Sequence, residues 1–159
     1  MKQMQEYVKG ESSVVYLEDE GHLINIDEEF QISLYGSPWT AIHGKPGKAF
    51  QIPRTDLGGK WEKIPASVDI LITHMPPYGL LDENAGKVKA GCKDLLRLVT
   101  EKLKPQIHVF GHIHESWGWT RLGKTLFINA SISKGSSVNR PVVVDYYMKT
   151  RKVEISQEL

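Results

Sequence analysis

Apolar and polar residues alternate in two neighbouring segments of the first third of the chain. The alternation passes through His22–Asp27 and again through Phe30–Tyr35, which is the period of a strand with one buried face. The two segments therefore predict a hairpin. Before them, the β-branched segment Ser12–Leu17 predicts a further strand, and the acidic residues Glu18–Gly21 predict a turn.

Periodicity is lost after the second strand of this hairpin. The strand ends in a turn at Tyr35–Trp39, and from Thr40 to about Pro65 glycine, proline and lysine are frequent. We expect a long loop there, with one helical turn at most. Loops of this length are usually functional or mobile.

The next segments carry continuous rather than alternating apolar residues. Val68–His74 is an apolar run that two prolines follow, and it predicts a strand buried on both faces. Cys92–Leu103 has a helical stripe of apolar residues that Pro105 ends, and Gln106–His114 is a second buried strand. A strand, a helix and a strand in this order predict parallel pairing with a right-handed crossover.

Two more strand-like segments lie near the carboxyl end, Thr125–Ile132 and Pro141–Met148, before a turn and a short last strand. The elements together predict an α/β fold. A length of 159 residues favours a single domain over residues 1–159.

Composition is that of a soluble globular protein, with 40% apolar and 25% charged residues. The net charge of +1 provides no basic field for an extended nucleic acid or an anionic membrane. The single cysteine, Cys92, cannot form an intramolecular disulfide, and neither an apolar signal core nor a bilayer-spanning run is visible. We therefore expect a cytoplasmic protein.

Three histidines follow the two strands of the predicted strand–helix–strand unit. His74 ends the first strand, and His112 and His114 follow the second. The carboxyl ends of parallel strands are where α/β proteins bind ligands, and neutral imidazole binds zinc, iron or manganese. Spacing alone leaves open whether His112 and His114 face one ion or two. A histidine at a strand end can also simply bond to backbone groups, but three together favour a metal site.

The remaining polar and aromatic candidates are interpreted more simply. His22 and His43 are expected at the surface, and His108 inside its strand is expected to be structural. Trp117 and Trp119 follow the histidine loop and either wall a nucleotide base or pack, which is the commoner use. The acidic patches at residues 18–20 and 27–29 are interpreted as solvated turns.

The order of these motifs resembles that of the calcineurin-like metallophosphoesterases. The matching motifs are YGSPW at 35–39, ILITHMPP at 70–77, HVFGHIHE at 108–115 and FINAS at 127–131. The resemblance runs from about Val14 to Ser131 and is closer to the metallophosphoesterase-domain-containing branch, some members of which hydrolyse phosphodiesters including cyclic nucleotides. It implies the carboxyl-terminal part of a four-layer α-β-β-α sandwich with a mixed sheet.

The resemblance also implies roles for individual residues. His74 and His112 resemble ligands of the second metal of a di-metal centre, and His114 resembles a ligand of the first. The metals would be one or two divalent transition ions such as Mn, Fe or Zn, and a hydroxide between them would attack the phosphorus of a small phosphoester or nucleotide. Asn129 in FINAS is a candidate for orienting a ligand or substrate, although a turn-forming role fits it as well.

The carboxylate-bearing motifs of the family (D-x-H, G-D-x-x-D and G-N-H-D/E) are missing from this sequence, so the leaving-group histidine has no counterpart. Without a bridging carboxylate two cations repel strongly, and we expect at most one metal to bind well, through His74 and His112. Loss of the first half would also expose apolar faces and strand edges. The leading interpretation is an impaired phosphoesterase that forms homo-oligomers or needs an amino-terminal partner chain. The alternatives are a non-catalytic nucleotide- or metal-binding remnant that acts as an interaction protein, and a gene boundary that makes Met1 an internal methionine.

Overall fold

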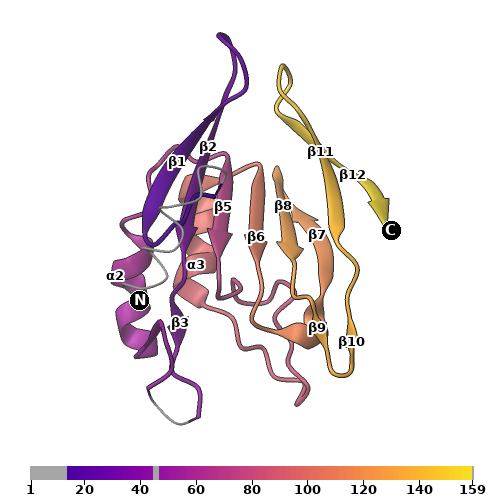
Figure 1. Cartoon of the computed structure of the whole chain (residues 1–159). Coiled ribbons are helices and arrows are strands. Elements are labelled where there is room, and N and C mark those ends of the chain that lie inside the picture. Colours follow the sequence, from indigo (N-terminus) through magenta and orange to yellow (C-terminus); the bar gives the residue numbers. More distant parts are fainter. Residues whose placement is uncertain (1–13, 45–46, 159) are drawn as a thin grey trace.

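The computed structural model describes residues 14–44 and 47–158, and its centre is a six-stranded mixed sheet with the strand order β1-β2-β5-β6-β8-β7 (Figure 1). The strands of this sheet are β1 (Glu20–Asn25), β2 (Gln31–Ser37), β5 (Ile70–Thr73), β6 (Ile107–Phe110), β7 (Gly118–Leu122) and β8 (Thr125–Asn129). The four central strands are parallel to one another, and the edge strands β1 and β7 run antiparallel to their neighbours. The structure is therefore α/β with a mixed sheet.

Smaller elements surround this sheet. Three two-stranded sheets are formed by β3 (Thr40–Ala41) with β4 (Gln51–Ile52), β9 (Ser133–Lys134) with β10 (Ser137–Val138), and β11 (Val142–Tyr147) with β12 (Lys152–Glu158). The helical elements are η1 (Arg54–Asp56), α2 (Leu57–Trp61), α3 (Lys93–Arg97), its π-helical continuation η2 (Leu98–Leu103) and η3 (His114–Ser116).

The helix formed by α3 and η2 confirms the prediction for Cys92–Leu103. Cys92 is extended and precedes the first helical residue, and Leu95 and Val99 on the buried stripe are fully buried. The helix ends at Lys104, which adopts a left-handed conformation with φ 47° directly before a proline. The strands on either side, β5 and β6, are parallel as predicted.

One face of the sheet is covered by helices. Its core joins Leu71, Phe110 and Phe127 of the sheet to buried side chains of α2 and α3. Leu71 and Phe127 have no exposed surface, and full burial of such a side chain contributes about 1.5–3 kcal/mol. This helix face is where the main core of the chain lies.

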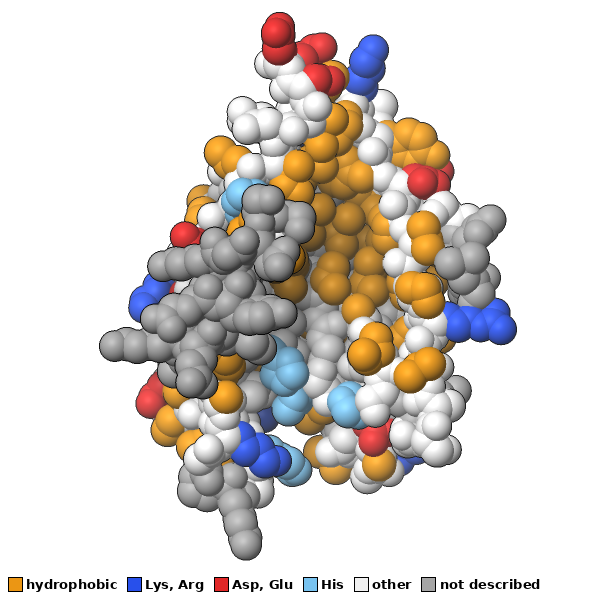
Figure 2. Space-filling model, in the orientation of Figure 1, with side chains coloured by type: hydrophobic (Ala, Val, Ile, Leu, Met, Phe, Trp, Pro, Cys, Tyr) orange, Lys and Arg blue, Asp and Glu red, His pale blue; other side chains and the backbone are white. Residues whose placement is uncertain are grey.

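The opposite face of the sheet is only partly covered. Its cluster consists of Ile107, Leu126 and Ile128 with Val153 of β12, so the β11–β12 hairpin covers β6 and β8. On β5, Ile72 points to this face and remains 37% exposed. Figure 2 shows hydrophobic side chains gathered in the hollow between the β1–β2 and β11–β12 hairpins. We call this the open face.

The prediction that Val68–His74 is buried on both faces is wrong for this chain. Leu71 and Thr73 are buried on the helix face, whereas Ile70 is half-buried and Ile72 is exposed on the open face. The apolar run therefore supplies two apolar faces, and among the described residues only one of them is covered.

The strand expected over Ser12–Leu17 is not formed in the part that is described. Residues 14–17 have no regular secondary structure, and Ser12 and Ser13 lie outside the described residues. Leu17 instead packs on Gly36 of β2, where a Cβ would lie 2.4 Å from the Cβ of Leu17. The segment thus lies against β2 at a position where only glycine leaves room, rather than extending the sheet.

The long loop expected over Thr40–Pro65 is more ordered than predicted. It holds the short strands β3 and β4 and the helical elements η1 and α2. Leu57 and Trp61, one helical turn apart, are almost completely buried in the helix-face core. Five residues with two glycines are too short to show helical periodicity, so tertiary packing decides this helix.

Within the described part of the chain, none of the helices has the length and apolarity needed to cross a bilayer.

Candidate metal centre

The candidate site lies at the carboxyl edge of the central parallel strands. His74 directly follows β5, and its backbone N–H donates to the carbonyl of Ser37 at the end of β2 (3.1 Å). The N–H of Gly111, directly after β6, donates to the carbonyl of His74 (3.2 Å). The ends of three strands are thus tied together by backbone hydrogen bonds, which brings His112 next to His74.

The rings of His74 and His112 are in direct contact. His112 Nδ1 lies 3.0 Å from His74 Nε2, so one nitrogen donates a hydrogen bond to the other. The ring centroids are 4.9 Å apart, and the ring planes meet at 68°. Two imidazole nitrogens from neighbouring strand ends therefore lie within hydrogen-bonding distance of each other.

The backbone of His112 has an unusual conformation that produces this contact. Its φ is 70°, in the left-handed region, which costs a non-glycine residue about 1–2 kcal/mol. The N–H of Ile113 donates to the carbonyl of Gly111 (2.8 Å), and the Ile113 side chain is buried. The turn thus anchors Ile113 in the protein and presents His112 to His74.

Electrostatics keep both rings neutral at neutral pH. Burial, followed by positive charge on His74, His43, His114 and Lys48, lowers the pKa of His112 to about 4. Partial desolvation, followed by the charge of His114, also lowers the pKa of His74. A neutral imidazole offers a lone pair to a metal ion, so the pair is ready to bind a cation.

His43 is exposed, as predicted, and lies close enough to His112 for a positive charge on it to lower the pKa of His112. It comes from the segment between β3 and β4, together with Lys48. No pattern in the sequence linked this segment to the histidine loop, because the two come together only in the folded chain.

The third predicted ligand, His114, is not grouped with the other two. It is exposed, begins η3, and acts on His74 and His112 through its charge. Across residues 14–44 and 47–158, no three His, Cys, Asp or Glu side chains are arranged to hold one metal ion. The structure therefore brings two of the three histidines together.

The histidine pair fits a transition metal. Two nitrogens that share one tetrahedral ion at about 2.0–2.1 Å lie about 3.3 Å apart, close to the 3.0 Å between His112 Nδ1 and His74 Nε2. The hydroxyl of Ser131 is buried without a hydrogen-bond partner among the described residues, 3.5 Å from where a Cβ on Gly111 would lie. A buried unpaired hydroxyl beside the histidine loop is a further polar group that a bound ion with its water shell can use.

Asn129, the predicted substrate-orienting residue, is completely buried. Its Nδ2 donates to the carbonyls of Ile113 (2.8 Å) and Leu81 (3.0 Å), and its Oδ1 accepts from the N–H of Ser131 (3.1 Å). Both donors of the amide are thus engaged with backbone carbonyls, one of which belongs to the histidine loop.

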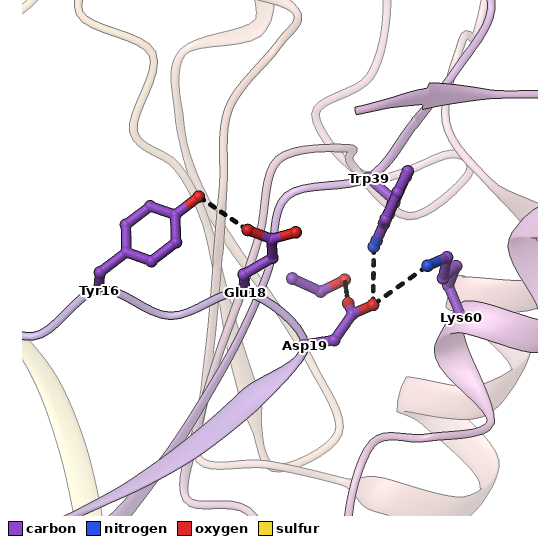
Figure 3. A network of polar contacts seen from close by, with 6 residues as sticks. Tyr16, Glu18, Asp19, Trp39 and Lys60 are labelled. Carbon is purple, nitrogen blue, oxygen red and sulfur yellow. Dashed lines mark hydrogen bonds and ion pairs between the residues drawn. The ribbon is translucent and has the colours of Figure 1, made fainter. Parts of the chain in front are cut away.

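Asp19 was interpreted as part of a solvated turn, and this interpretation is wrong. Its carboxylate accepts hydrogen bonds from Ser37 Oγ (2.7 Å) and Trp39 Nε1 (2.7 Å), and Lys60 Nζ lies at 3.3 Å, above the Trp39 ring. Figure 3 shows the carboxylate between Trp39 and Lys60. The network fixes the end of β2, whose Ser37 carbonyl also holds the backbone of His74.

The sequence is similar to those of several known proteins. No family model matches the sequence. The chain is 41% identical over 137 residues to the UPF0046 protein T07D4.2 of Caenorhabditis elegans, covering 84% of this chain and 33% of the relative. It is 45% identical over 116 residues to Metallophosphoesterase domain-containing protein 1 of Homo sapiens, covering 70% of this chain and 35% of the relative. The similarity supports a metallophosphoesterase-like family for this chain.

The chain spans about a third to a half of the length of the curated relatives it matches. A solved crystal structure superposes on 98% of the chain with a TM-score of 0.62 and 16% identity, and the chain covers 59% of that solved chain. At this identity the superposition shows the fold alone.

Proposed function

We propose that the chain is the carboxyl-terminal part of a metal-dependent phosphoesterase and supplies nitrogen ligands of its metal centre. The observation that carries the proposal is the 3.0 Å contact between His112 Nδ1 and His74 Nε2 at adjacent strand ends. The metallophosphoesterase name of a relative that is 45% identical supports the reaction class.

In this proposal His74 and His112 bind one divalent transition ion such as Mn, Fe or Zn, and His114 is a ligand of a second ion. A bound ion supplies Lewis-acid polarisation of the phosphoryl oxygen and activates water. The residues of the chain hold the two imidazoles neutral and aimed at one point. The positive charge of Lys48 near His112 favours an anionic substrate, for which we propose a small phosphoester or nucleotide.

The same proposal makes residues 1–159 one partial domain of a four-layer α-β-β-α sandwich. The open face supports it, because Ile72 on β5 is 37% exposed among apolar neighbours. The relatives are two to three times as long as their matched part, and the rest of the solved neighbour has no counterpart here. We propose that an amino-terminal partner chain, or a second copy in a homo-oligomer, covers this face and that the former also supplies the missing carboxylates.

A second candidate is a non-catalytic remnant that binds a nucleotide or a single metal and acts as an interaction protein. The observation that favours it is the lack of a three-ligand cluster among the described residues. The two candidates differ in turnover, since the remnant hydrolyses nothing with any metal. In both we propose a cytoplasmic location, which suits the free thiol of Cys92.

Titration of the full chain with Co(II), Mn(II) and Zn(II) tests the metal site in the wild type, His112→Ala and His22→Ala. His22 is the control because it lies exposed on β1. We expect about one ion per chain, with His112→Ala weakening binding by at least about tenfold because one of two nitrogen ligands is lost. Equal metal content in all three proteins would refute the proposed metal site.

Hydrolysis of a chromogenic phosphodiester separates the two candidate functions. The assay uses the chain alone and the chain mixed with the purified amino-terminal segment of a longer relative. A partial phosphoesterase gains activity in the mixture and loses that gain in His112→Ala. An interaction protein stays inactive in both.

A further inference from the structure

The conformation of the histidine loop needs support from outside the loop. His112 has a φ of 70°, and a non-glycine residue keeps this conformation only where its surroundings impose it. Within the loop, the N–H of Ile113 donates to the carbonyl of Gly111 (2.8 Å), and the N–H of Ser116 makes a longer bond to the carbonyl of Ile113 (3.3 Å). The exposed side chain of His114 has no hydrogen bond to hold it among the described contacts.

Asn129 supplies support from the neighbouring strand. It is the last residue of β8 and lies opposite Phe110, the last residue of β6, in the parallel ladder. From there its amide reaches the carbonyl of Ile113, the residue between the two histidines, at 2.8 Å. The bond is fully buried, since Asn129 has no exposed surface, and such a bond is costly to leave unmade.

The orientation of this amide is determined by three bonds at once. Nδ2 donates to the carbonyls of Ile113 and Leu81, and Oδ1 accepts from the N–H of Ser131. A rotated amide would place its oxygen against two carbonyl oxygens, so only one orientation is possible. The side chain is therefore a rigid link rather than an adaptable one.

The same link joins the histidine loop to a second, well-braced loop. Leu81 precedes Asp82, whose buried carboxylate accepts from the N–H groups of Gly79 and Gly91, each at 2.9 Å. Ser116, two residues after His114, donates to the carbonyl of Glu83 in that loop (2.7 Å). The loop at residues 79–91 is thus a fixed support on which Asn129 can hold Ile113.

We propose that Asn129 is a positioning residue for the metal centre, because it holds the carbonyl of Ile113 so that His112 keeps the left-handed conformation that faces His74. The inference rests on the proposed metal-binding function and changes the role expected for Asn129. This side chain acts through His112 and does not contact the substrate.

Asn129→Asp tests the proposal, since it keeps the shape of the side chain and replaces both N–H donors by an oxygen. Thr125→Val is the matched control. Thr125 is buried at the opposite end of the same strand, and its hydroxyl donates to the carbonyl of Pro105 at 2.7 Å. Both substitutions remove a buried bond to a backbone carbonyl, so both should lower the Tm, but only one of them reaches the histidine loop.

The first readout is Co(II) affinity, followed by the visible absorption of the bound ion. Loss of a residue that orients a metal ligand typically weakens binding about 10–100-fold, and we expect this range for Asn129→Asp. For Thr125→Val we expect less than about a twofold change. Equal Co(II) affinity in Asn129→Asp and the wild type would overturn the proposal.

The second readout needs no metal. Imidazole ¹⁵N spectra of the metal-free protein report the hydrogen bond between His112 Nδ1 and His74 Nε2. We expect that signal to be kept in Thr125→Val and lost in Asn129→Asp. If the wild type binds no Co(II), the proposed function fails, while these spectra still decide the positioning role: an unchanged signal in Asn129→Asp refutes it.

Should Asn129→Asp fail to fold, Asn129→Ser takes its place in both measurements. Its hydroxyl is too short to reach both carbonyls, so the same loss of Co(II) affinity and of the ring signal is expected, without a buried charge. A folded Asn129→Ser protein with wild-type Co(II) affinity and ring signals would overturn the proposal.

Discussion

The two faces of the six-stranded sheet are built from the same strands but differ in how completely they are covered. On the helix face, Leu71, Phe110 and Phe127 lie under α2 and α3 with almost no exposed surface. On the open face, the β11–β12 hairpin covers β6 and β8, and Ile72 on β5 remains 37% exposed.

The difference follows from where the covering elements come from. The helix face is covered by α2 and α3, which connect consecutive strands of the sheet, so the local chain path places them there. Among the residues that the structure describes, the carboxyl-terminal hairpin is what covers the open face. The described residues therefore complete one core and leave the other partly uncovered, which is the basis of the oligomer or partner-chain proposal.

The largest difference between the two faces should appear in the free energy of unfolding when two neighbouring residues of β5 are truncated. Leu71→Ala removes a side chain with no exposed surface, and we expect it to lower the free energy of unfolding by about 2–5 kcal/mol. Ile72→Ala, one residue along, should cost less than about 1 kcal/mol because its side chain is already partly in water. Urea unfolding of the metal-free protein measures both values. Similar losses would mean that the open face is covered in solution.

The helix face should also show a pH dependence caused by His108. This residue is fully buried, and burial lowers its pKa to about 3, against about 6.5 in the unfolded chain. Its Nε2 lies 2.9 Å from Thr73 Oγ1, which donates to the carbonyl of Met75, so Nε2 carries the proton and Nδ1 is bare.

The direction of this pH dependence follows from how many protons the folded and unfolded chains bind at His108. Between pH 6.5 and 3 the unfolded chain binds a proton at His108 that the folded chain does not, so stability is complete above about pH 6.5 and falls as the pH is lowered. From pH 7 to pH 5 we expect this residue to account for about 2 kcal/mol of lost stability. Urea unfolding of the wild type and of His108→Gln at both pH values measures it, and equal pH dependence in the two proteins would contradict it.

A smaller effect is expected on self-association through the open face. Ile72→Asp places a charge in the hollow and should weaken self-association by at least about tenfold, which corresponds to about 1.4 kcal/mol. Leu122→Asp is the control: Leu122 is 48% exposed on the edge strand β7. It pairs with Thr125, two residues from Phe127, and therefore lies on the helix side.

Light scattering over a range of protein concentrations measures this effect. We expect the wild type and Leu122→Asp to associate alike and Ile72→Asp to remain smaller. A wild type that is monomeric at every concentration would contradict the homo-oligomer proposal and leave the partner chain.

Several elements could be predicted from sequence because their signals are local. The helix of Cys92–Leu103 has its own apolar stripe and a proline after it, and the hairpin of β1 and β2 has its own alternation. Parallel pairing of β5 and β6 follows from the order strand, helix, strand. Elements that depend on distant partners were missed or wrong. The five-residue helix α2 and the edge strand β7, with its mostly exposed residues, have too few apolar positions to reveal a period.

The candidate site also has parts that could be predicted from the sequence and parts that could not. Motif order and strand ends predicted that His74 and His112 meet, because the carboxyl ends of adjacent parallel strands share one edge. Nothing local indicated that Asp19 would be held by Ser37 and Trp39, since its neighbours in sequence are acidic and its partners lie far along the chain.

The β1–β2 hairpin, the strands β5, β6 and β8, the helix of α3 and η2, and the histidines at the strand ends could be read from the sequence, because hydrophobic period and chain order act over a few residues. The left-handed conformation of His112, the bond from Asn129 to the histidine loop, and the partial exposure of one sheet face among the described residues became visible in the folded chain. These features depend on contacts between strands distant in sequence, and such contacts exist only once the sheet has been assembled.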